Sequence, residues 1–288
     1  MLAGDIGNRL FDNFKKNNPE RFYNCGVAEA NMTGVASGLA SSGLRPITYT
    51  ITPFNTFRCF EQIRLDVCYP NLPVIIVGTG SGLSYASLGA THHSMEDISV
   101  LKSLPNLQII CPGDKLEVKE ALIEAYKSGK PTYIRLGKKG EPVVHEKKPN
   151  FKIGRSIYLK KGKDVALLGV GNALPIASKC EEILFKKKIK CDLISFHTAK
   201  PLDNKLLKSL FRLGKLIVVV EEHGLIGGVG SSILEWANIN NLNTHNVLRF
   251  GGPDKFLTGC GNQNEGRKFI GLTSQNISSK IIKKIKNK

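Results

Sequence analysis

Short apolar runs alternate along the chain with stretches typical of helices, and this alternation constrains the fold more than any other feature. Pro73–Val77 (PVIIV) is rich in β-branched residues, as expected for a parallel strand buried on both faces. Beyond it, predicted strands at Leu107–Cys111 and Thr132–Leu136 lie on either side of a predicted helix at Lys115–Lys127. This order predicts a mostly parallel sheet flanked by helices.

The first part of the chain continues this pattern. The predicted helices are Asn8–Lys16, Ala28–Ser41 and Asn55–Cys68, and the predicted strands are Arg21–Cys25 and Pro46–Thr50. A sheet wound in this way normally has a strand ahead of Gly4. If the chain truly starts at residue 1, we expect that this first strand is missing or supplied by a partner.

A polar segment that contains Pro and Lys, Gly137–Lys152, indicates a linker between two domains, 1–150 and 151–288. A second α/β pattern follows it. Its predicted strands are Asp164–Val170, Cys191–Phe196, Leu216–Val220 and Asn246–Phe250, and its predicted helices are Ala173–Phe185, Asn204–Phe211, Val229–Ala237 and Ser274–Ile285. We therefore expect an α/β protein of two domains, each built on a mostly parallel sheet.

Composition excludes several classes of protein. The sequence has no apolar run of about 18 residues and no signal peptide, so we expect no contact with a membrane. Its seven cysteines are scattered without a C-x-x-C pair, which favours a reducing cytoplasm over a disulfide framework or a zinc site. The net charge of +17 comes from lysines spread over many segments with few aromatic residues between them. This spread argues against a specific nucleic-acid site, and a small anionic substrate or an acidic partner suits the charge.

Glu29 is the one acid in a stretch of small and apolar residues, NCGVAEANMTGVASGLA at 24–40. A helix of such residues must pack tightly against its neighbours. Glu29 falls in its first turn, at the positive end of the helix dipole. By itself, an acid at this place more often only helps the helix to begin.

Phe54, Phe57 and Phe60 are spaced three apart in the next predicted helix. Such spacing usually marks a stripe of core residues, and the alternative is an aromatic pocket that stacks on a flat heteroaromatic ring.

A polar segment at 89–97, GATHHSMED, carries the adjacent residues His92 and His93. Neighbouring residues seldom converge on one metal ion, so we predict no metal site. Histidines here suit proton transfer or the binding of substrate hydroxyl groups. Arg135 ends a predicted strand, where strands of α/β sheets face the ligand crevice, and an arginine there often binds a phosphate or carboxylate.

Together these segments resemble the C-terminal half of transketolases, and most of all the separate C-terminal subunits of split transketolases. The matching segments are 4–7 (GDIG), 24–40, 54–60, 89–114, 131–137 (PTYIRLG) and 219–235 (VVEEHGLIGGVGSSILE). They cover nearly the whole chain in the family's order. The resemblance implies a thiamine-diphosphate pyrimidine-binding domain followed by a transketolase C-terminal domain.

The resemblance also implies a chemistry. The glutamate that matches Glu29 hydrogen-bonds N1′ of the aminopyrimidine of thiamine diphosphate and favours the imino tautomer, which removes the C2 proton of the thiazolium. The resulting carbanion takes a two-carbon ketol unit from a ketose and gives it to an aldose, while the protein controls orientation and tautomer. By resemblance, Phe54, Phe57 and Phe60 line the aminopyrimidine pocket and Asp5 lies near the thiazolium. His92, His93 and Arg135 contact the substrate, with Arg135 at the sugar phosphate.

The sequence departs from the family's pattern at three points. Leu88 replaces an acid that reads a sugar hydroxyl, and Gly80 replaces a histidine that helps to hold the sugar phosphate. The identity of the sugars, and whether the substrate is phosphorylated, therefore stay open. No Gly-Asp-Gly segment, which would hold Mg²⁺ and the diphosphate, occurs in the sequence. We expect an N-terminal transketolase subunit to hold most of the Mg²⁺ site, in an α2β2 assembly with active sites at the subunit interfaces.

Three alternatives remain open. They are the β subunit of a 2-oxo-acid dehydrogenase, a carboligase like deoxyxylulose-phosphate synthase, and a non-catalytic scaffold or regulatory subunit of the same fold. The THHSMED segment argues against the first, and the intact Glu29 and phenylalanines argue against the last.

Overall fold

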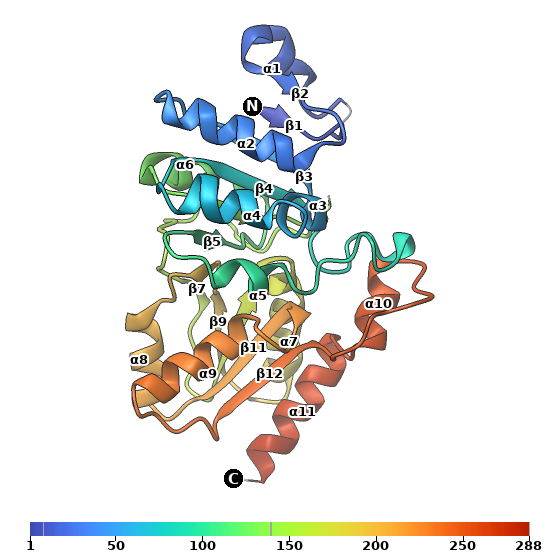
Figure 1. Cartoon of the computed structure of the whole chain (residues 1–288). Helices are drawn as coiled ribbons and strands as arrows, with labels where there is room; N and C mark the ends of the chain where they lie inside the picture. The colour runs from blue at the N-terminus through green and yellow to red at the C-terminus, as the bar shows by residue number, and fades with distance from the viewer. Residues whose placement is uncertain (8, 139, 288) are drawn as a thin grey trace.

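The computed structural model describes residues 1–7, 9–138 and 140–287, and it contains two sheets stacked along the long axis of the molecule (Figure 1). The larger sheet has seven strands in the order β10-β5-β6-β4-β3-β1-β2, all parallel except β10. Its strands are β1 (Leu2–Ala3), β2 (Tyr23–Asn24), β3 (Ile47–Ile51), β4 (Ile75–Thr79), β5 (Gln108–Ile110), β6 (Thr132–Arg135) and β10 (Thr198–Lys200). The predicted α/β class with a mostly parallel sheet is confirmed.

The strand that we expected to be missing, or supplied by a partner, is present as β1. Leu2 is fully buried and pairs with Tyr23 on one side and Thr48 on the other, so β1 lies inside the sheet. The prediction was wrong because a strand of only two residues leaves no alternating pattern in the sequence. The predicted helix at Asn8–Lys16 includes residue 8, which is outside the described residues, and the described helix α1 spans Asp12–Asn17.

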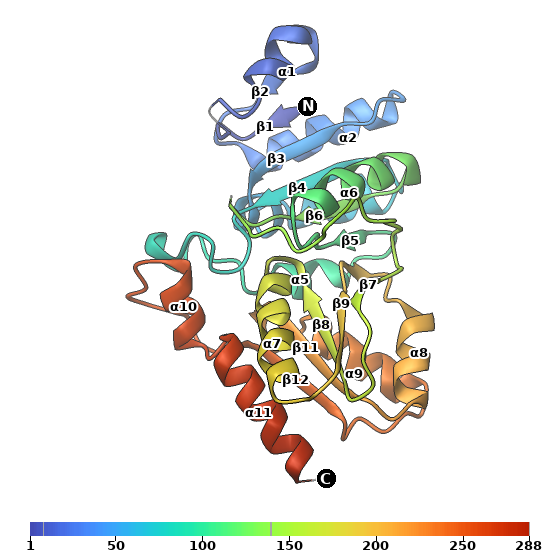
Figure 2. The same ribbon diagram turned by 180° about the vertical axis from the view of Figure 1, so that it is seen from behind.

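Helices cover both faces of the larger sheet. Helices α2 (Glu29–Ser41) and α4 (Phe60–Gln62) lie on the face toward the viewer in Figure 1, and α6 (Lys115–Ser128) lies on the opposite face, seen in Figure 2. Smaller pieces are η1 (Pro19–Arg21), α3 (Thr52–Thr56), the π-helix η2 (Ile63–Cys68), η3 (Ala86–Leu88) and α5 (Asp97–Lys102). These layers leave the carboxyl ends of β1, β3 and β4 side by side at one edge of the domain.

The single helix predicted at Asn55–Cys68 is wrong. The helix begins earlier, at Thr52, because Pro53 suits a first turn. It then breaks between Thr56 and Phe60, where Thr56 Oγ1 donates to the Thr52 carbonyl (2.7 Å) and Cys59 Sγ donates to the Phe54 carbonyl (3.2 Å). Side-chain bonds of this kind compete with the backbone ladder of a helix.

The second sheet has five strands in the order β12-β11-β8-β9-β7, with β7 antiparallel to its neighbour. Its strands are β7 (Ile157–Lys160), β8 (Val165–Val170), β9 (Cys191–Ser195), β11 (Leu216–Gly224) and β12 (Val247–Gly252). Helix α9 (Val229–Ile239) covers one face, and α7 (Leu174–Lys186) and α11 (Ser274–Lys286) cover the other (Figures 1 and 2). The remaining elements are η4 (Gly171–Ala173), α8 (Asn204–Arg212) and α10 (Gln263–Phe269).

One hydrophobic core runs through both domains. On β8, Val165 and Leu167 face the core under α7 and α11, whereas Ala166 and Leu168 belong to a larger core that continues to Met32 of α2. Strand β10, which comes from the second half of the chain, completes the edge of the first sheet. The two domains are therefore joined by shared apolar contacts as well as by the chain.

The described residues of the segment 137–152 form no helix or strand, but the segment is held against the first domain. His145 is 6% exposed, and its backbone N–H and Nδ1 both lie 2.9 Å from Asp114 Oδ2. The boundary between residues 150 and 151 stays a prediction. Among the described residues, no helix has the length and apolar character needed to cross a membrane.

Candidate functional site

Glu29 is the first residue of α2 and is buried, with 2% of its surface exposed. The chain enters the helix through Gly26, whose positive φ of 67° suits glycine. Gly4, at the end of β1, allows the close approach: a Cβ there would lie 3.0 Å from Thr50 and 3.5 Å from Cγ of Glu29. The negative carboxylate is favoured at the helix N-terminus.

Arg58 lies between α3 and α4 and closes the open side of Glu29. Its Nη1 donates to Glu29 Oε2 at 2.7 Å, and its Cζ lies 4.7 Å from the centre of the Phe54 ring. The ring of His92 also makes an edge contact with Phe54, with 5.2 Å between the ring centres. Glu29, Arg58, Phe54 and His92 thus form a continuous row across the carboxyl ends of the strands.

Asp5 and His92 are held by short local bonds. The Asp5 carboxylate accepts from Asn24 Nδ2 (2.9 Å), and Asn24 Oδ1 in turn accepts from the backbone N–H of Asp5. His92 is partly exposed, and its Nδ1 lies 2.9 Å from the Thr91 hydroxyl, which leaves Nε2 to face a ligand. The structure therefore brings four predicted residues, Asp5, Glu29, Phe54 and His92, to the same edge of the sheet.

Three other predicted residues lie elsewhere. Phe57 is 36% exposed at the break in the helix, and Phe60 packs against the main core. His93 is 7% exposed, and its Nε2 donates to the carbonyl of Ala86 (3.0 Å), so its ring is engaged within the loop. Phe54 alone of the phenylalanines contacts both Arg58 and His92.

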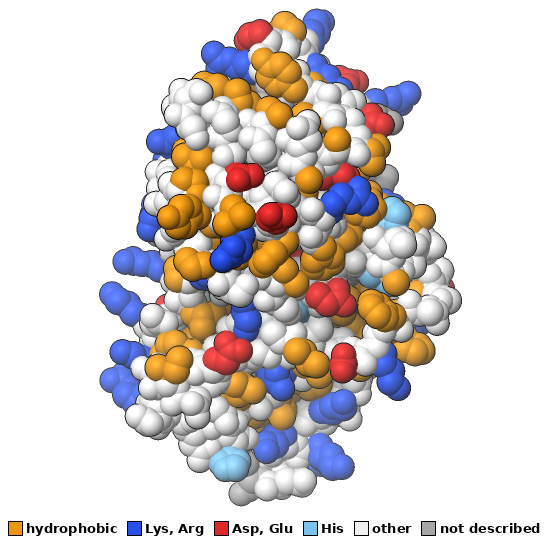
Figure 3. Space-filling model, in the orientation of Figure 1, with side chains coloured by type: hydrophobic (Ala, Val, Ile, Leu, Met, Phe, Trp, Pro, Cys, Tyr) orange, Lys and Arg blue, Asp and Glu red, His pale blue; other side chains and the backbone are white. Residues whose placement is uncertain are grey.

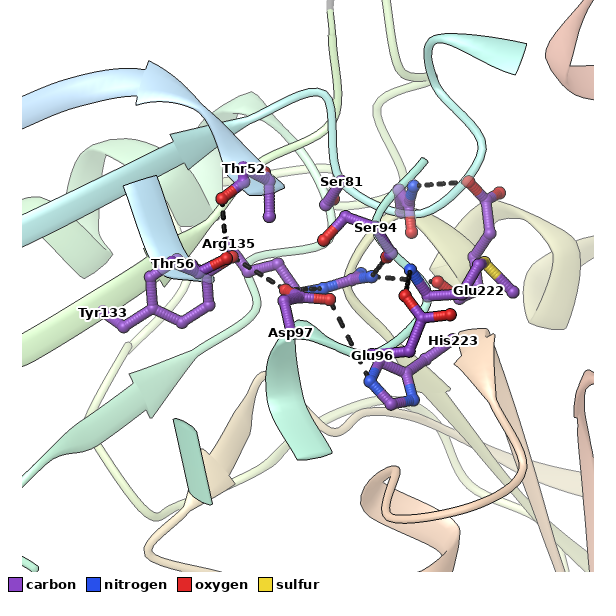
Figure 4. A network of polar contacts seen from close by, with 12 residues as sticks. Thr52, Thr56, Ser81, Ser94, Glu96, Asp97, Tyr133, Arg135, Glu222 and His223 are labelled. Carbon is purple, nitrogen blue, oxygen red and sulfur yellow. Dashed lines mark hydrogen bonds and ion pairs between the residues drawn. The ribbon is translucent and has the colours of Figure 1, made fainter. Parts of the chain in front are cut away.

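The predicted contact of Arg135 with a sugar phosphate is wrong for this structure. Its side chain is 1% exposed, and Nε donates to Asp97 Oδ2 (2.8 Å) while Nη2 donates to the carbonyls of Ser94 (3.1 Å) and Glu222 (2.9 Å). Figure 4 shows the guanidinium running between these groups. Arg135 therefore joins the first sheet to β11 and offers no free surface to an anion.

The electrostatics of this cluster agree with a permanent ion pair. Burial opposes the charged form of Arg135, but the adjacent Asp97 raises the pKa of the guanidinium. Burial likewise opposes ionisation of Asp97, but Arg135 and His223 keep the pKa of its carboxyl below the ordinary value. Tyr133 adds a hydrogen bond to Asp97 Oδ2 (2.7 Å), and burial next to this carboxylate holds the pKa of Tyr133 well above its usual range.

Sequence reasoning missed Arg58, Lys138 and Glu222. The exposed Lys138 lies over the ring of Tyr85 (4.7 Å), and Tyr85 faces the ring of His92 at 6.1 Å. Lys138 thus places a cation on the ring that lies next to His92. In the sequence Lys138 is one of several lysines in a polar segment. Only its position three residues after β6 could have indicated that it lies near the site.

Glu222 is fully buried and ties the loop that precedes His92 to the second domain. Its carboxylate accepts from the backbone N–H of Leu83 (2.8 Å) and from Gln263 Nε2 (2.9 Å), and it pairs with Arg267. A Cβ on Gly82 would lie 2.5 Å from this carboxylate, so the loop can approach only with glycine there. The pair of acids Glu221 and Glu222 gave no sign of this role in the sequence.

Exposed apolar side chains lie along the face of α2, the broken helix and η2. They are Val27 (74% exposed), Val35 (44%), Phe57 (36%), Leu65 (44%) and Tyr69 (85%). Figure 3 views the molecule from the side of α2 and α4, and hydrophobic side chains are grouped over the upper and middle parts of that view. A patch of this kind marks a surface that another protein covers.

Comparisons with known proteins agree on a family. Residues 5–141 match the family described as transketolase, pyrimidine binding domain, and residues 154–277 match transketolase, C-terminal domain. A transketolase C-terminal section of Methanocaldococcus jannaschii is 34% identical over 277 residues, which cover 95% of this chain and 85% of that protein. One subunit of an apulose-4-phosphate transketolase from Actinobacillus succinogenes is 35% identical over 77% of this chain and 71% of its own.

A deoxyxylulose-5-phosphate synthase of Halothermothrix orenii is also 35% identical, over 85% of this chain but only 38% of the synthase. Among solved structures, a split-gene transketolase described as an inactive β4 tetramer matches with a TM-score of 0.85 and 31% identity, over 98% of this chain and 90% of that one. With two family models, similar relatives and a matching structure in agreement, this chain belongs to the transketolase family, as the C-terminal part of a split transketolase.

Proposed function

We propose that the chain is the C-terminal subunit of a two-component transketolase, which moves a two-carbon ketol unit from a ketose to an aldose with thiamine diphosphate. The observation that carries this proposal is the row of Glu29, Phe54 and His92 at the carboxyl ends of the parallel strands. In the transketolase family such a row supplies one half of an active site.

The residues present fit the aminopyrimidine end of the cofactor. A buried carboxylate at a helix start can share a proton with a ring nitrogen, and the Phe54 ring offers an apolar face for a flat ring. When bound, thiamine diphosphate supplies the electron sink for breaking and making a carbon–carbon bond. Glu29 would share the proton that sets the tautomer of the bound ring, and Asp5, just after β1, would lie on the thiazolium side of the site.

The substrate end of the site is formed by His92 and Lys138. His92 is oriented by the hydroxyl of Thr91, so its ring can bind a sugar hydroxyl or relay a proton. Lys138 takes the role first assigned to Arg135, because its amino group lies over Tyr85, the ring next to His92, and is exposed to an anionic substrate. His93 acts only indirectly, by fixing the loop at Ala86.

A partner subunit supplies the rest of the site. The chain has no Gly-Asp-Gly segment, so Mg²⁺ and the diphosphate are held by an N-terminal transketolase subunit in an α2β2 assembly. The exposed apolar residues on α2, the broken helix and η2 are the surface that this subunit and a second copy cover.

Glu29→Gln tests the proposal directly. Mixed with a partner that carries the diphosphate domain, thiamine diphosphate and Mg²⁺, the wild-type chain should transfer a ketol unit, and Glu29→Gln should lower kcat by a factor of about 10² or more. Glu20→Gln, at an exposed acid outside the site, is the matched control. Full activity from this chain without a partner would contradict the half-site, and decarboxylation of a 2-oxo acid without ketol transfer would favour the dehydrogenase or synthase alternatives.

A further inference from the structure

Arg58 occupies the place that the proposed function gives to the aminopyrimidine ring. Its Nη1 donates to Glu29 Oε2 at 2.7 Å, and its guanidinium lies over the ring of Phe54, with 4.7 Å from Cζ to the ring centre. The carboxylate and the aromatic face are the two features of this chain that suit a flat, nitrogen-bearing ring. The side chain of Arg58 contacts both the Glu29 carboxylate and the Phe54 ring.

The guanidinium matches such a ring in chemistry as well as in position. It is planar, delocalised and rich in N–H donors, and it binds carboxylates and stacks on aromatic faces. The carboxylate oxygen that accepts from Arg58 and the face of Phe54 that Arg58 covers cannot serve a second flat donor at the same time. The ring and the guanidinium therefore compete for one site.

Arg58 also neutralises a buried charge. Glu29 is 2% exposed, whereas the side chain of Arg58 is 48% exposed and lies at the mouth of the site. A buried carboxylate without a partner is strongly destabilising. The half-exposed arginine satisfies this carboxylate and can still turn out into solvent.

From this geometry we infer that Arg58 is an internal stand-in for the aminopyrimidine: it fills the ring's site in the free subunit and must move out when thiamine diphosphate binds. The inference rests on the proposed function, because that function places the ring at Glu29 and Phe54. It gives Arg58 opposite effects in the two states. The same contact stabilises the empty subunit and opposes the cofactor.

Arg58→Met tests the inference through two measurements that do not depend on turnover. The free variant should unfold at a lower temperature than the wild-type chain, because Glu29 loses its partner. In the assembly with the partner subunit, thiamine diphosphate with Mg²⁺ should bind about two- to fivefold more tightly by calorimetric titration, the factor that a half-exposed ion pair represents. Arg21→Met, at an exposed arginine outside the site, should change neither value.

Two further variants separate the effect of the ion pair with Glu29 from the effect of the planar guanidinium. Arg58→Met placed in a Glu29→Gln background should cost no stability, because no buried charge is left to neutralise. Arg58→Lys keeps the charge but not the planar face, so it should retain the stability of the free chain and bind the cofactor with an affinity between wild type and Arg58→Met. If Arg58→Met does not fold, Arg58→Lys still tests whether the planar guanidinium opposes cofactor binding.

The outcomes distinguish this inference from the proposed function. If the wild-type assembly does not bind thiamine diphosphate, both fail. If it binds, but Arg58→Met binds equally or more weakly, the proposed function stands and Arg58 is a ligand of the bound state instead of a stand-in. Tighter binding together with a less stable free subunit supports the inference.

Discussion

His145 gives the stability of the chain a pH dependence between neutral and alkaline pH. Burial disfavours its charged form, but a hydrogen bond to Asp114 (2.9 Å) and the nearby carboxylate of Glu117 (3.2 Å) outweigh it and raise the pKa of the ring to about 9. Because the folded-state pKa lies above the ordinary value near 6.5, this contribution to stability is complete below pH 6.5 and is lost as the pH rises through 9. The free energy of unfolding, measured with urea, should therefore fall between these pH values.

His145→Gln should make the unfolding free energy nearly flat over that range while lowering it at pH 6. His245→Gln, at a histidine outside this cluster, is the control and should keep the slope of the wild-type chain. An equal slope in His145→Gln and wild type would show that other groups cause the pH dependence.

Single residues also show where sequence reasoning stops. Glu29 could be singled out because it is the one acid among small and apolar residues, and His92 because a histidine in a polar segment suits proton transfer or hydroxyl binding. Arg135 was misassigned because the end of a strand indicates which edge of the sheet a residue lies on, but not which element covers that edge. Here the guanidinium of Arg135 donates its hydrogen bonds to Asp97 and to the carbonyl of Glu222. Arg58 was missed because its role depends on an ion pair with Glu29, which lies 29 positions earlier in the chain.

The exposed face of helix α2 is part of the proposed interface with the partner subunit or a second copy. Gly38 is exposed, and a Cβ built on it meets nothing within 4 Å, so a larger residue fits the free subunit. Gly38→Gln should hold or raise the stability of the free chain, since glycine costs up to about 1 kcal/mol in a helix. It should also weaken assembly with the partner or a second copy, because α2 lies beside exposed apolar residues.

Analytical ultracentrifugation with and without the partner checks this expectation. Lys119→Gln on α6, at the opposite face of the sheet, is the matched control and should assemble as the wild-type chain does. Unchanged assembly of Gly38→Gln would remove the face of α2 from the proposed interface.

Helices and strands with a regular residue pattern could be predicted from the sequence. Elements altered by side-chain hydrogen bonds or by long-range strand pairing could not. The prediction of α2 differs from the structure by one residue, because its small residues have no competing structure and Gly43 ends it with a positive φ of 88°. The helix predicted at Asn55–Cys68 failed because Thr56 and Cys59 bond back to the chain. Strand β10 could not be assigned to the first sheet, since its pairing with β5 joins residues far apart in the sequence.

The two domains of the molecule share an apolar core. Side chains of β8 and α9 belong to the same apolar cluster as those of α2 and β4. At the centre of this junction lie Asp97 and Arg135, both buried, with His223 of β11 at 4.0 Å from Asp97. We therefore expect both domains to unfold in a single transition.

Asp97→Asn tests this expectation at the junction itself. The substitution leaves the charge of Arg135 buried without its partner, which should cost about 3–5 kcal/mol of unfolding free energy. Because Arg135 also donates to the carbonyl of Glu222 on β11, calorimetry should show one transition at a lower temperature. Glu235→Gln, which breaks the more exposed pair with Lys102 between the same domains, should cost at most about 1 kcal/mol. Two separate transitions in Asp97→Asn, with only one of them shifted, would mean that each domain is stable without the other and that the shared core is not what holds them together.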